Sequence, residues 1–513
     1  MRLRALGIFF AAALTVVAAC GGGSGNGQET AVGPPKAGGS VTFGLRADFL
    51  SMDPLVLNND SDQSVGNGIY DPLIARVGDK GDLGPWLADS WDPSADLKTW
   101  TLHLHQGVKF HDGTPFNADA VVFNAQRHMD PRNKSLSLSD ASLIDSVKAV
   151  DDRTVAFALK SPWTDFPQIL VAPIGLMASP AAIKQYGADY GKHPVGTGPF
   201  VFKEWVTGDH ITATKNKDYW KQGFPYLDSV TWRPIPDQDA KYASLKAGQI
   251  DVLQVATADQ VVKAQKDSKL KIWKYEGDGG TFVMMNTKAP PFDDINARMA
   301  ITYATNRKEI VQQIGHDLYP VATGPFPPGS QWDTKVSEPN YDEAKAKAAL
   351  QAYGKPLSFT FNIVSDPITR QYGQVLQAQY KKLGINVELV QMDQATLIQA
   401  ALGKKFQLQI FQYGDWFDPD RYMFNAYISK GSIVNYTGYG TPATDAALIK
   451  GRTTLDAATR KEAYGVIQQA IAKDAPLVWL HYNTSYAISS KRVQNLNTIY
   501  SSITKPYQVW VSS

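Results

Sequence analysis

The sequence predicts an α/β protein with two lobes, preceded by an export signal and a tether. The mature chain of roughly 490 residues exceeds the roughly 250–300 residues at which a single core stops growing, so we expect at least two lobes. In the second half, predicted strands at 359–364 and 386–390 flank a predicted helix at 372–383 that Gly384 ends. Residues 341–350 are strong helix formers. This strand-helix-strand order indicates an α/β lobe.

The amino terminus has the pattern of an export signal. Arg2 and Arg4 precede an apolar run over residues 5–19. The run is shorter than the about 20 apolar residues of a membrane span. Val17-Ala18-Ala19-Cys20 resembles a bacterial lipoprotein box, which implies that a signal peptide over 1–19 is removed and that Cys20 is lipidated.

Cys20 is the only cysteine, so no intramolecular disulfide can form. Residues 20–39 lack large apolar side chains and predict a flexible tether with a reach of about 25 Å. One acyl chain anchors a protein only marginally, so the lipoprotein resemblance implies several chains. We therefore expect an extracytoplasmic protein, in the periplasmic space, held on the outer face of the cell membrane through Cys20.

The composition argues against a nucleic-acid partner. Lys plus Arg number 51 and Asp plus Glu number 49, and no basic tract occurs. After the signal no second long apolar segment follows. The chain is rich in aromatic residues, with 12 Trp and 23 Tyr. Most of these rings should lie in the core, and some suit a cleft for solutes with apolar and polar faces.

Turn and strand signals organise the first half. Residues 40–45 alternate like a first strand, and residues 100–104 with 108–110 predict a hairpin region. A turn at 111–115 follows, and Asn117 is the predicted cap of a helix beginning there. The Gly196-Thr197-Gly198-Pro199 segment predicts a bend of the kind that a strand crossing between lobes requires.

Eight sequence blocks, in order along nearly the whole mature chain, carry a family resemblance. The chain resembles the extracellular solute-binding proteins of family 5 (cluster C), the dipeptide and oligopeptide receptors of ABC importers. The blocks are Met52–Pro54, Ile69–Leu73, Pro85–Trp91, Val108–Phe116, Gly196–Phe200, Asn216–Trp220, Leu245–Asp251 and Ala297–Ile301.

The resemblance implies a two-lobed periplasmic-binding-protein-like fold of type II. Residues 40–74, 194–282 and 488–513 would build the first lobe, residues 75–193 a subdomain inserted into it, and residues 283–487 the second lobe. Two crossings would join the lobes. Closure around a solute, by differential affinity for the closed form, is the implied mechanism.

The candidate site is the segment from Tyr413 to Asp420. In peptide-binding relatives an Asp three positions after a Trp pairs with the peptide ammonium group. Here only Phe417 separates Trp416 from Asp418, so Asp415 or Asp418 would substitute, and Trp416 would be an aromatic platform under the solute. The alternative for Asp418 and Asp420 is that they cap the helix beginning near Arg421.

The family architecture implies further cleft residues. These are Asp48 and Phe49 after the first strand, Met285 at a crossing, and Asn435 and Tyr436 beyond the Trp416 segment. Core packing or loop structure is the alternative for each.

The implied function is capture of a peptide or similar small solute and its delivery to a permease by a monomeric receptor. Oligosaccharide, another amphipathic solute or a metal chelate remains an alternative ligand, and a binding lipoprotein without a transport role is an alternative function. Neither a Gly-x-Ser-x-Gly elbow nor a catalytic Cys occurs, which disfavours a hydrolase. His103, His105 and His111 make a metal site conceivable, but the sequence assigns no metal, cofactor or catalytic residue.

Overall fold

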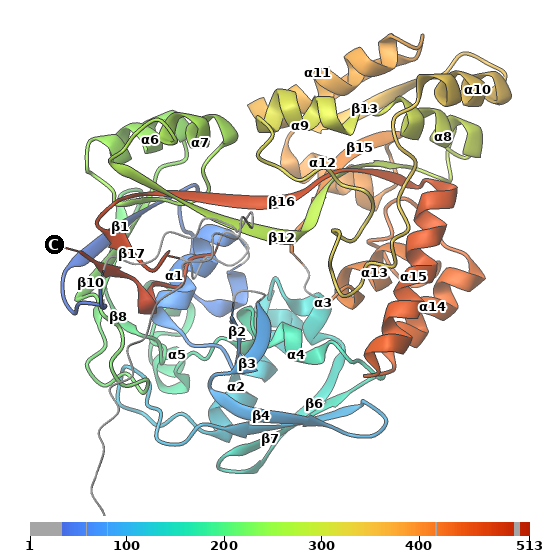
Figure 1. Ribbon diagram of the computed structural model, residues 1–513. Coiled ribbons are helices and arrows are strands. Elements are labelled where there is room, and N and C mark those ends of the chain that lie inside the picture. The colour runs from blue at the N-terminus through green and yellow to red at the C-terminus, as the bar shows by residue number, and fades with distance from the viewer. Residues whose placement is uncertain (1–32, 58, 79–80, 416–417, 497–502, 513) are drawn as a thin grey trace, which may run out of the picture.

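One ten-stranded sheet runs through both lobes (Figure 1). The structure, a computed structural model, describes residues 33–57, 59–78, 81–415, 418–496 and 503–512. The strand order is β14-β13-β15-β12-β16-β11-β1-β10-β9-β8. The strands are β1 (Ser40–Leu45), β8 (Phe200–Val206), β9 (His210–Lys215), β10 (Ser229–Pro234), β11 (Val252–Leu253), β12 (Leu270–Met285), β13 (Ser358–Val364), β14 (Asn386–Met392), β15 (Leu408–Tyr413) and β16 (Leu477–Ser490).

The long strands β12 and β16 join the two lobes. They pair antiparallel from Leu270 opposite Ser490 to Met284 opposite Leu477, and the register shifts between Glu276 and Gly280. At one end β16 pairs with β11, and at the other end β12 pairs with β15. The lobe boundaries expected at 282/283 and 487/488 therefore fall inside two continuous strands.

The first lobe packs around β1. This strand runs parallel to β10 and β11, and β11 is antiparallel to β16, which runs from the second lobe to the first, so β1 runs toward the second lobe. Phe43 and Trp232 stack in the core, with ring centroids 6.4 Å apart. The helices of this lobe are α1 (Asp60–Ile69), α5 (Pro180–Tyr186), α6 (Gln238–Lys246) and α7 (Ala258–Ala264).

The two ends of the folded chain lie together on this lobe. Arg492 donates a hydrogen bond from Nη2 to the carbonyl oxygen of Ser40, at 3.0 Å. Nearby, β17 (Val493–Gln494) pairs with β18 (Trp510–Val511). The amino-terminal and carboxyl-terminal segments therefore leave the fold from neighbouring positions.

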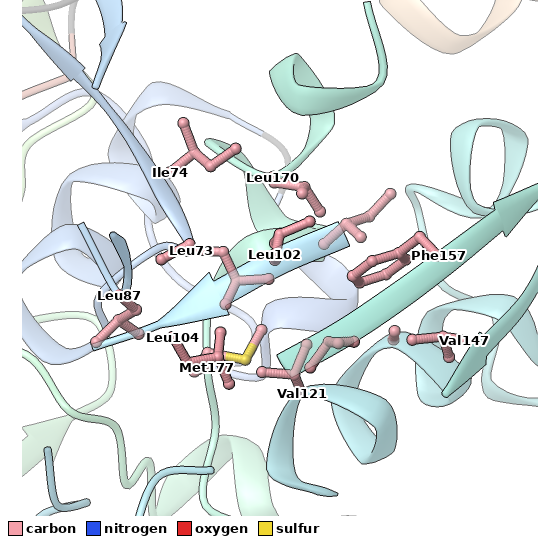
Figure 2. Packing of buried hydrophobic residues seen from close by; sticks show 14 of the residues in the cluster. Leu73, Ile74, Leu87, Leu102, Leu104, Val121, Val147, Phe157, Leu170 and Met177 are labelled. Atoms are coloured by element: carbon pink, nitrogen blue, oxygen red, sulfur yellow. The ribbon is translucent and has the colours of Figure 1, made fainter. Parts of the chain in front are cut away.

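A separate four-stranded sheet, in the order β4-β5-β7-β6, forms the centre of the inserted subdomain. Its apolar core is shown in Figure 2 and includes Leu102 and Phe157 from neighbouring strands together with Val121. The elements are β2 (Ile74–Val77), β3 (Asp82–Pro85), β4 (Ala88–Pro93), β5 (Thr99–Leu104), β6 (Ile144–Asp151), β7 (Thr154–Leu159), α2 (Ala118–Met129), α3 (Leu138–Ala141) and α4 (Phe166–Ile169).

Asp71 joins the subdomain to the first lobe. Its buried carboxylate accepts hydrogen bonds from Trp86 Nε1 at 2.6 Å, Trp220 Nε1 at 2.9 Å, Tyr219 Oη at 3.0 Å and Thr197 Oγ1 at 3.3 Å. Burial raises the pKa of Asp71 to about 6, against the opposing effect of these donors. Four of the sequence blocks thus meet at one carboxylate.

Two predictions about the first half are wrong. Residues 108–110 do not pair with β5, whose partners are β4 and β7; they form a loop closed by the Phe110 N–H on the Thr114 carbonyl. The Gly196–Pro199 bend is not a crossing. A Cβ on Gly196 would lie 2.2 Å from the carbonyl oxygen of Ile69, so glycine here permits close packing within the first lobe.

The second lobe surrounds β13, β14 and β15. The buried Arg307 guanidinium anchors it by donating to Glu338 Oε2 at 2.7 Å and to the Trp479 carbonyl of β16 at 2.6 Å. The helices are α8 (Ile295–Ala304), α9 (Arg307–Gly315), α10 (Glu343–Tyr353), α11 (Pro367–Lys381), α12 (Gln394–Leu402), α13 (Asp420–Tyr427), α14 (Pro442–Arg452) and α15 (Ala457–Asp474). Among all the residues described, no helix has the length and apolar character to cross a membrane.

Candidate functional site

The candidate site lies where β15 ends beside the two crossing strands. Tyr413, the last residue of β15, is opposite Gly280 of β12, and Gly280 in turn is opposite Tyr482 of β16. Gly414 and Asp415 therefore emerge at the junction between the lobes.

Glycines in β12 make room for this segment. A Cβ on Gly277 would lie 1.9 Å from Asp415 Oδ1, and a Cβ on Gly279 would lie 2.3 Å from the Gly414 carbonyl oxygen. Both distances are too short for any side chain. The two glycines are thus required for Asp415 to approach the crossing.

Asp415 contacts both crossing strands at once. Its Oδ1 accepts hydrogen bonds from the Gly279 N–H of β12 at 3.2 Å and from Asn483 Nδ2 of β16 at 3.1 Å. Asn483 Nδ2 also donates to the Tyr413 carbonyl at 2.9 Å, which fixes the end of β15. The half-buried carboxylate is therefore held by groups on the connection between the lobes.

Aromatic rings surround Tyr413. Its ring centroid lies 4.8 Å from Phe282, 5.3 Å from Tyr422 and 6.1 Å from Phe411, and Phe411 lies 5.4 Å from Tyr436. Burial raises the pKa of Tyr413 and of Tyr436, so both hydroxyls stay neutral near pH 7. Rings with neutral hydroxyls beside a carboxylate suit a solute that has an apolar body and a cationic group.

Asp418 and Asp420 are engaged by buried arginines. Arg460 binds both oxygens of Asp418, each at 2.6 Å, and the Asp420 N–H donates to Asp418 Oδ1 at 3.0 Å. Arg452 donates from Nη2 to Asp420 Oδ2 at 2.8 Å. Such bidentate pairs hold a carboxylate firmly. Of the two aspartates predicted to receive an ammonium group, Asp418 is occupied by Arg460, while Asp415 stands at the junction.

The family model of the bacterial extracellular solute-binding proteins, family 5, matches residues 82–434, more than half of the chain. The chain belongs to this family.

Relatives of the family 5 protein differ in the solute they are named for. The chain is 32% identical over 475 residues to the glutathione-binding protein GsiB of Pectobacterium atrosepticum, and the match covers 90% of this chain and 92% of GsiB. It also resembles the solved structure of DppA from Helicobacter pylori in complex with peptide STSA, with 27% identity, a TM-score of 0.81 and coverage of 93% and 99%. The agropinic acid complex of AgaA from A. tumefaciens R10 matches with 25% identity, a TM-score of 0.79 and coverage of 93% and 99%.

These matches confirm the predicted family and the two-lobed α/β fold. The family 5 relatives are binding proteins by name, and the coarse function follows: this chain is a solute-binding protein rather than a member of an enzyme family.

The other predicted site residues lie at different places in the fold. Met285 is fully buried in the second-lobe core, and Phe49 is buried in the first-lobe core. Asn435 uses its amide to donate to the carbonyls of Ile428 and Tyr439 inside its own loop. Tyr436 belongs to the aromatic group through Phe411, and Asp48 is exposed. Trp416, like Cys20, lies outside the described residues.

The three histidines considered as metal ligands are bound separately. His103 lies 3.4 Å from Asp92, His105 lies 2.8 Å from Asp89, and His111 Nε2 lies 2.9 Å from the Gly198 carbonyl. Within the described part of the chain no cluster of three or more His, Cys, Asp or Glu side chains is arranged to hold a metal ion.

Sequence reasoning missed Asn483, Tyr422 and the two glycines of β12. The glycines carried a usable signal, because Gly277-Asp278-Gly279-Gly280 interrupts a segment that otherwise reads as a strand. Asn483 offered none, since it comes close to Asp415 only through the pairing of β12, β15 and β16.

Proposed function

We propose that this protein is the receptor of an ABC importer and captures a peptide-like solute between its lobes, with Asp415 receiving the solute's ammonium group. Glutathione or a short peptide has the required chemistry: a free ammonium group, amide groups and a compact body. The observation that carries the proposal is the place of Asp415, half-buried and bonded to β12 and β16 together.

The position of Asp415 favours it over Asp418 for this role. An ammonium group would reach Asp418 only by displacing Arg460, which binds both carboxylate oxygens in a buried site. Breaking such a buried pair is costly, because it leaves a charge uncompensated. Asp415 accepts hydrogen bonds from the Asn483 amide and the Gly279 N–H, and an ammonium group would add a charge-assisted contact to the same carboxylate.

The first lobe contributes the opposite wall in this proposal. The carboxyl end of β1 points toward the second lobe, and the segment after it carries Arg46, the exposed Asp48 and Leu50, which is 97% exposed. Arg46 is paired with Asp60 at 2.7 Å. Loops at the carboxyl ends of strands commonly supply ligand contacts in α/β proteins, and closure would bring this segment toward Asp415.

The test is calorimetric titration with glutathione, a dipeptide and their N-acetylated forms. Binding of an amine-bearing solute that is lost on N-acetylation, and that weakens at least about tenfold in Asp415→Asn, supports the proposal. The matched control is Asp445→Asn, which removes a carboxylate of the same lobe that accepts a hydrogen bond from the Ser429 N–H. Equal binding by Asp415→Asn and wild type would refute the role of Asp415.

Mass spectrometry of the solute that co-purifies with the protein tests the ligand class independently. Recovery of a sugar or a metal chelate would replace the peptide-like solute, and a solute recovered in chemically altered form after incubation would indicate a hydrolase.

Lipidation of Cys20 and delivery to a permease belong to the same proposal. A charged start, an apolar run over residues 5–19 and the Val17–Cys20 box support it. Cys20→Ser should move the protein from the membrane fraction to the soluble fraction of its host. Uptake of the bound solute should then require the neighbouring permease genes; uptake that persists without them would favour a binding lipoprotein with no transport role.

A further inference from the structure

The inserted subdomain touches the second lobe through buried side chains far apart in sequence. Trp163 Nε1 donates to Asp420 Oδ2 at 2.8 Å, across 257 positions of the chain. Next to it, the Thr164 N–H donates to the Arg452 carbonyl at 3.0 Å. Arg452 is the last residue of α14, and Trp163 and Thr164 belong to the segment that precedes α4.

This contact is fully desolvated and balanced in charge. Trp163 is 2% exposed and Asp420 is 1% exposed. Arg452 neutralises Asp420, and Arg460 neutralises Asp418. A third carboxyl group, Asp165, is buried beside these two, and burial together with the two carboxylates raises its pKa well above the usual value.

A second contact lies at the edge of the same face. Arg421 Nη2 of α13 donates to Asp140 Oδ2 of α3 at 2.6 Å, across 281 positions. The Arg421 side chain is 40% exposed and that of Asp140 is 10% exposed. The two contacts use neighbouring residues, 420 and 421, on the second lobe and two different elements of the subdomain.

Neither contact involves the junction at Asp415, so both can form without a solute. An opening of the lobes about β12 and β16 that moves the subdomain away from α13 and α14 would expose the Trp163 indole and the Asp420–Arg452 pair to water. The closed form therefore gains two hydrogen bonds to charged groups that an open form lacks.

We propose that Trp163–Asp420 and Asp140–Arg421 form an interlobe latch that favours the closed form whether or not a solute is bound. This inference rests on the proposed opening and closing of the lobes, and it adds residues that set affinity without touching the solute. A latch of this kind raises the apparent affinity for every solute by the same factor, because it changes only the population of the closed form.

The latch is tested by small-angle scattering of the solute-free full-length chain carrying Cys20→Ser. Trp163→Phe and Arg421→Ala should each give a larger radius of gyration, as the ratio of closed to open molecules falls on the order of tenfold. The double variant Asp140→Asn/Arg421→Ala should open the lobes no further than either single variant, because both substitutions remove the same contact.

Matched controls lie within the first lobe. Arg492→Ala removes an ion pair with Asp251 whose side-chain exposures of 44% and 14% resemble those of Arg421 and Asp140. Trp273→Phe removes an indole hydrogen bond to Ser489 at 2.8 Å inside the sheet. Both control variants should keep the wild-type radius of gyration.

The outcomes separate the latch from the ligand proposal. If Trp163→Phe and Arg421→Ala scatter like wild type and the controls, while circular dichroism shows all of them folded, the latch does not exist. If they open and added glutathione or dipeptide closes them again, both proposals are supported. If they open and neither solute closes them, the latch stands and the peptide-like solute is refuted.

Discussion

Trp86 Nε1 donates a 2.6 Å hydrogen bond to Asp71 Oδ1, and through this contact a tryptophan of the subdomain is bound to a carboxylate at the edge of the first lobe. Trp220 Nε1 and Tyr219 Oη donate to the same carboxylate from a segment further along the chain. Removal of Asp71 would therefore leave the buried Trp86 and Tyr219 donors and the half-buried Trp220 indole without this acceptor.

Asp71→Ala should lower the free energy of unfolding by about 3–5 kcal/mol, because unsatisfied buried donors keep their full desolvation cost. Urea denaturation followed by tryptophan fluorescence measures this. Asp92→Ala, which removes a carboxylate whose side chain is 72% exposed, should change stability by less than about 1 kcal/mol. Similar losses in the two variants would contradict the assigned role of Asp71.

The ionisation of Asp71 gives stability a distinctive pH dependence. Its pKa is about 6 in the folded protein and 3.8 as an ordinary aspartate, so the folded state holds the proton more tightly. The resulting stabilisation is complete below pH 3.8 and is lost as the pH rises to about 6, by about 3 kcal/mol. Asp71→Asn should flatten this part of the stability profile. An unchanged slope would show that ionisation of Asp71 does not cause the pH dependence.

Arg307 and Glu338 should behave as a unit. Arg307→Leu leaves Glu338 buried without its cation and should cost about 3–5 kcal/mol of unfolding free energy. Arg307→Leu combined with Glu338→Leu should recover part of that loss, since no charge then remains buried. Thermal unfolding of the two single variants and the double variant decides this, and strictly additive losses would show that the pair is not coupled.

Gly277→Ala should weaken solute binding more than it weakens folding. The new Cβ would lie 1.9 Å from Asp415 Oδ1, so the carboxylate must leave its hydrogen bonds to Gly279 and Asn483. We expect at least about a tenfold loss of affinity for the amine-bearing solute. Gly403→Ala, at the end of α12, serves as the control and should bind normally. If Gly277→Ala also binds normally, solute binding does not depend on the present position of Asp415.

His481 should make the protein sensitive to acid. It is buried between Tyr319 and Tyr372, with ring centroids at 4.8 and 5.8 Å, and burial lowers its pKa from 6.5 to about 4. The unfolded chain takes up the proton first, so this contribution to stability is present above pH 6.5 and is lost as the pH falls to about 4, by about 3 kcal/mol.

His481→Gln should therefore lose less stability than wild type between pH 6.5 and pH 4, measured by urea denaturation at each pH. His103→Gln is the control, because the His103 side chain is 47% exposed. An acid-induced loss that His481→Gln leaves undiminished would exclude His481 as its cause.

Local patterns in the sequence predicted local structure well. Strand β1 covers the predicted residues 40–45, and Asn117 caps α2 by accepting from the Ala120 N–H. Both depend on contacts within a few residues. The hairpin at 100–110 was predicted wrongly because β5 pairs with β4 and β7, and a strand's partner is decided by the whole sheet rather than by its neighbours in sequence.

The sequence predicts a candidate site at Tyr413–Asp420, but it does not assign roles within that segment. The Tyr413–Asp420 segment was found from family spacing, yet spacing cannot separate Asp415 from Asp418. The difference comes from Arg460 and Arg452, which lie on α15 and α14 and meet the segment only after the second lobe is packed. Met285 and Phe49 were predicted as cleft residues on position alone, and both side chains are buried in lobe cores.

Arg492 holds the carboxyl-terminal segment against Ser40, so both ends of the folded chain are tied to one half of a two-part body. A bead, a surface or a fused reporter attached at either end would grip that same half. The second lobe would remain free to move, and immobilised protein should bind its solute as protein in solution does.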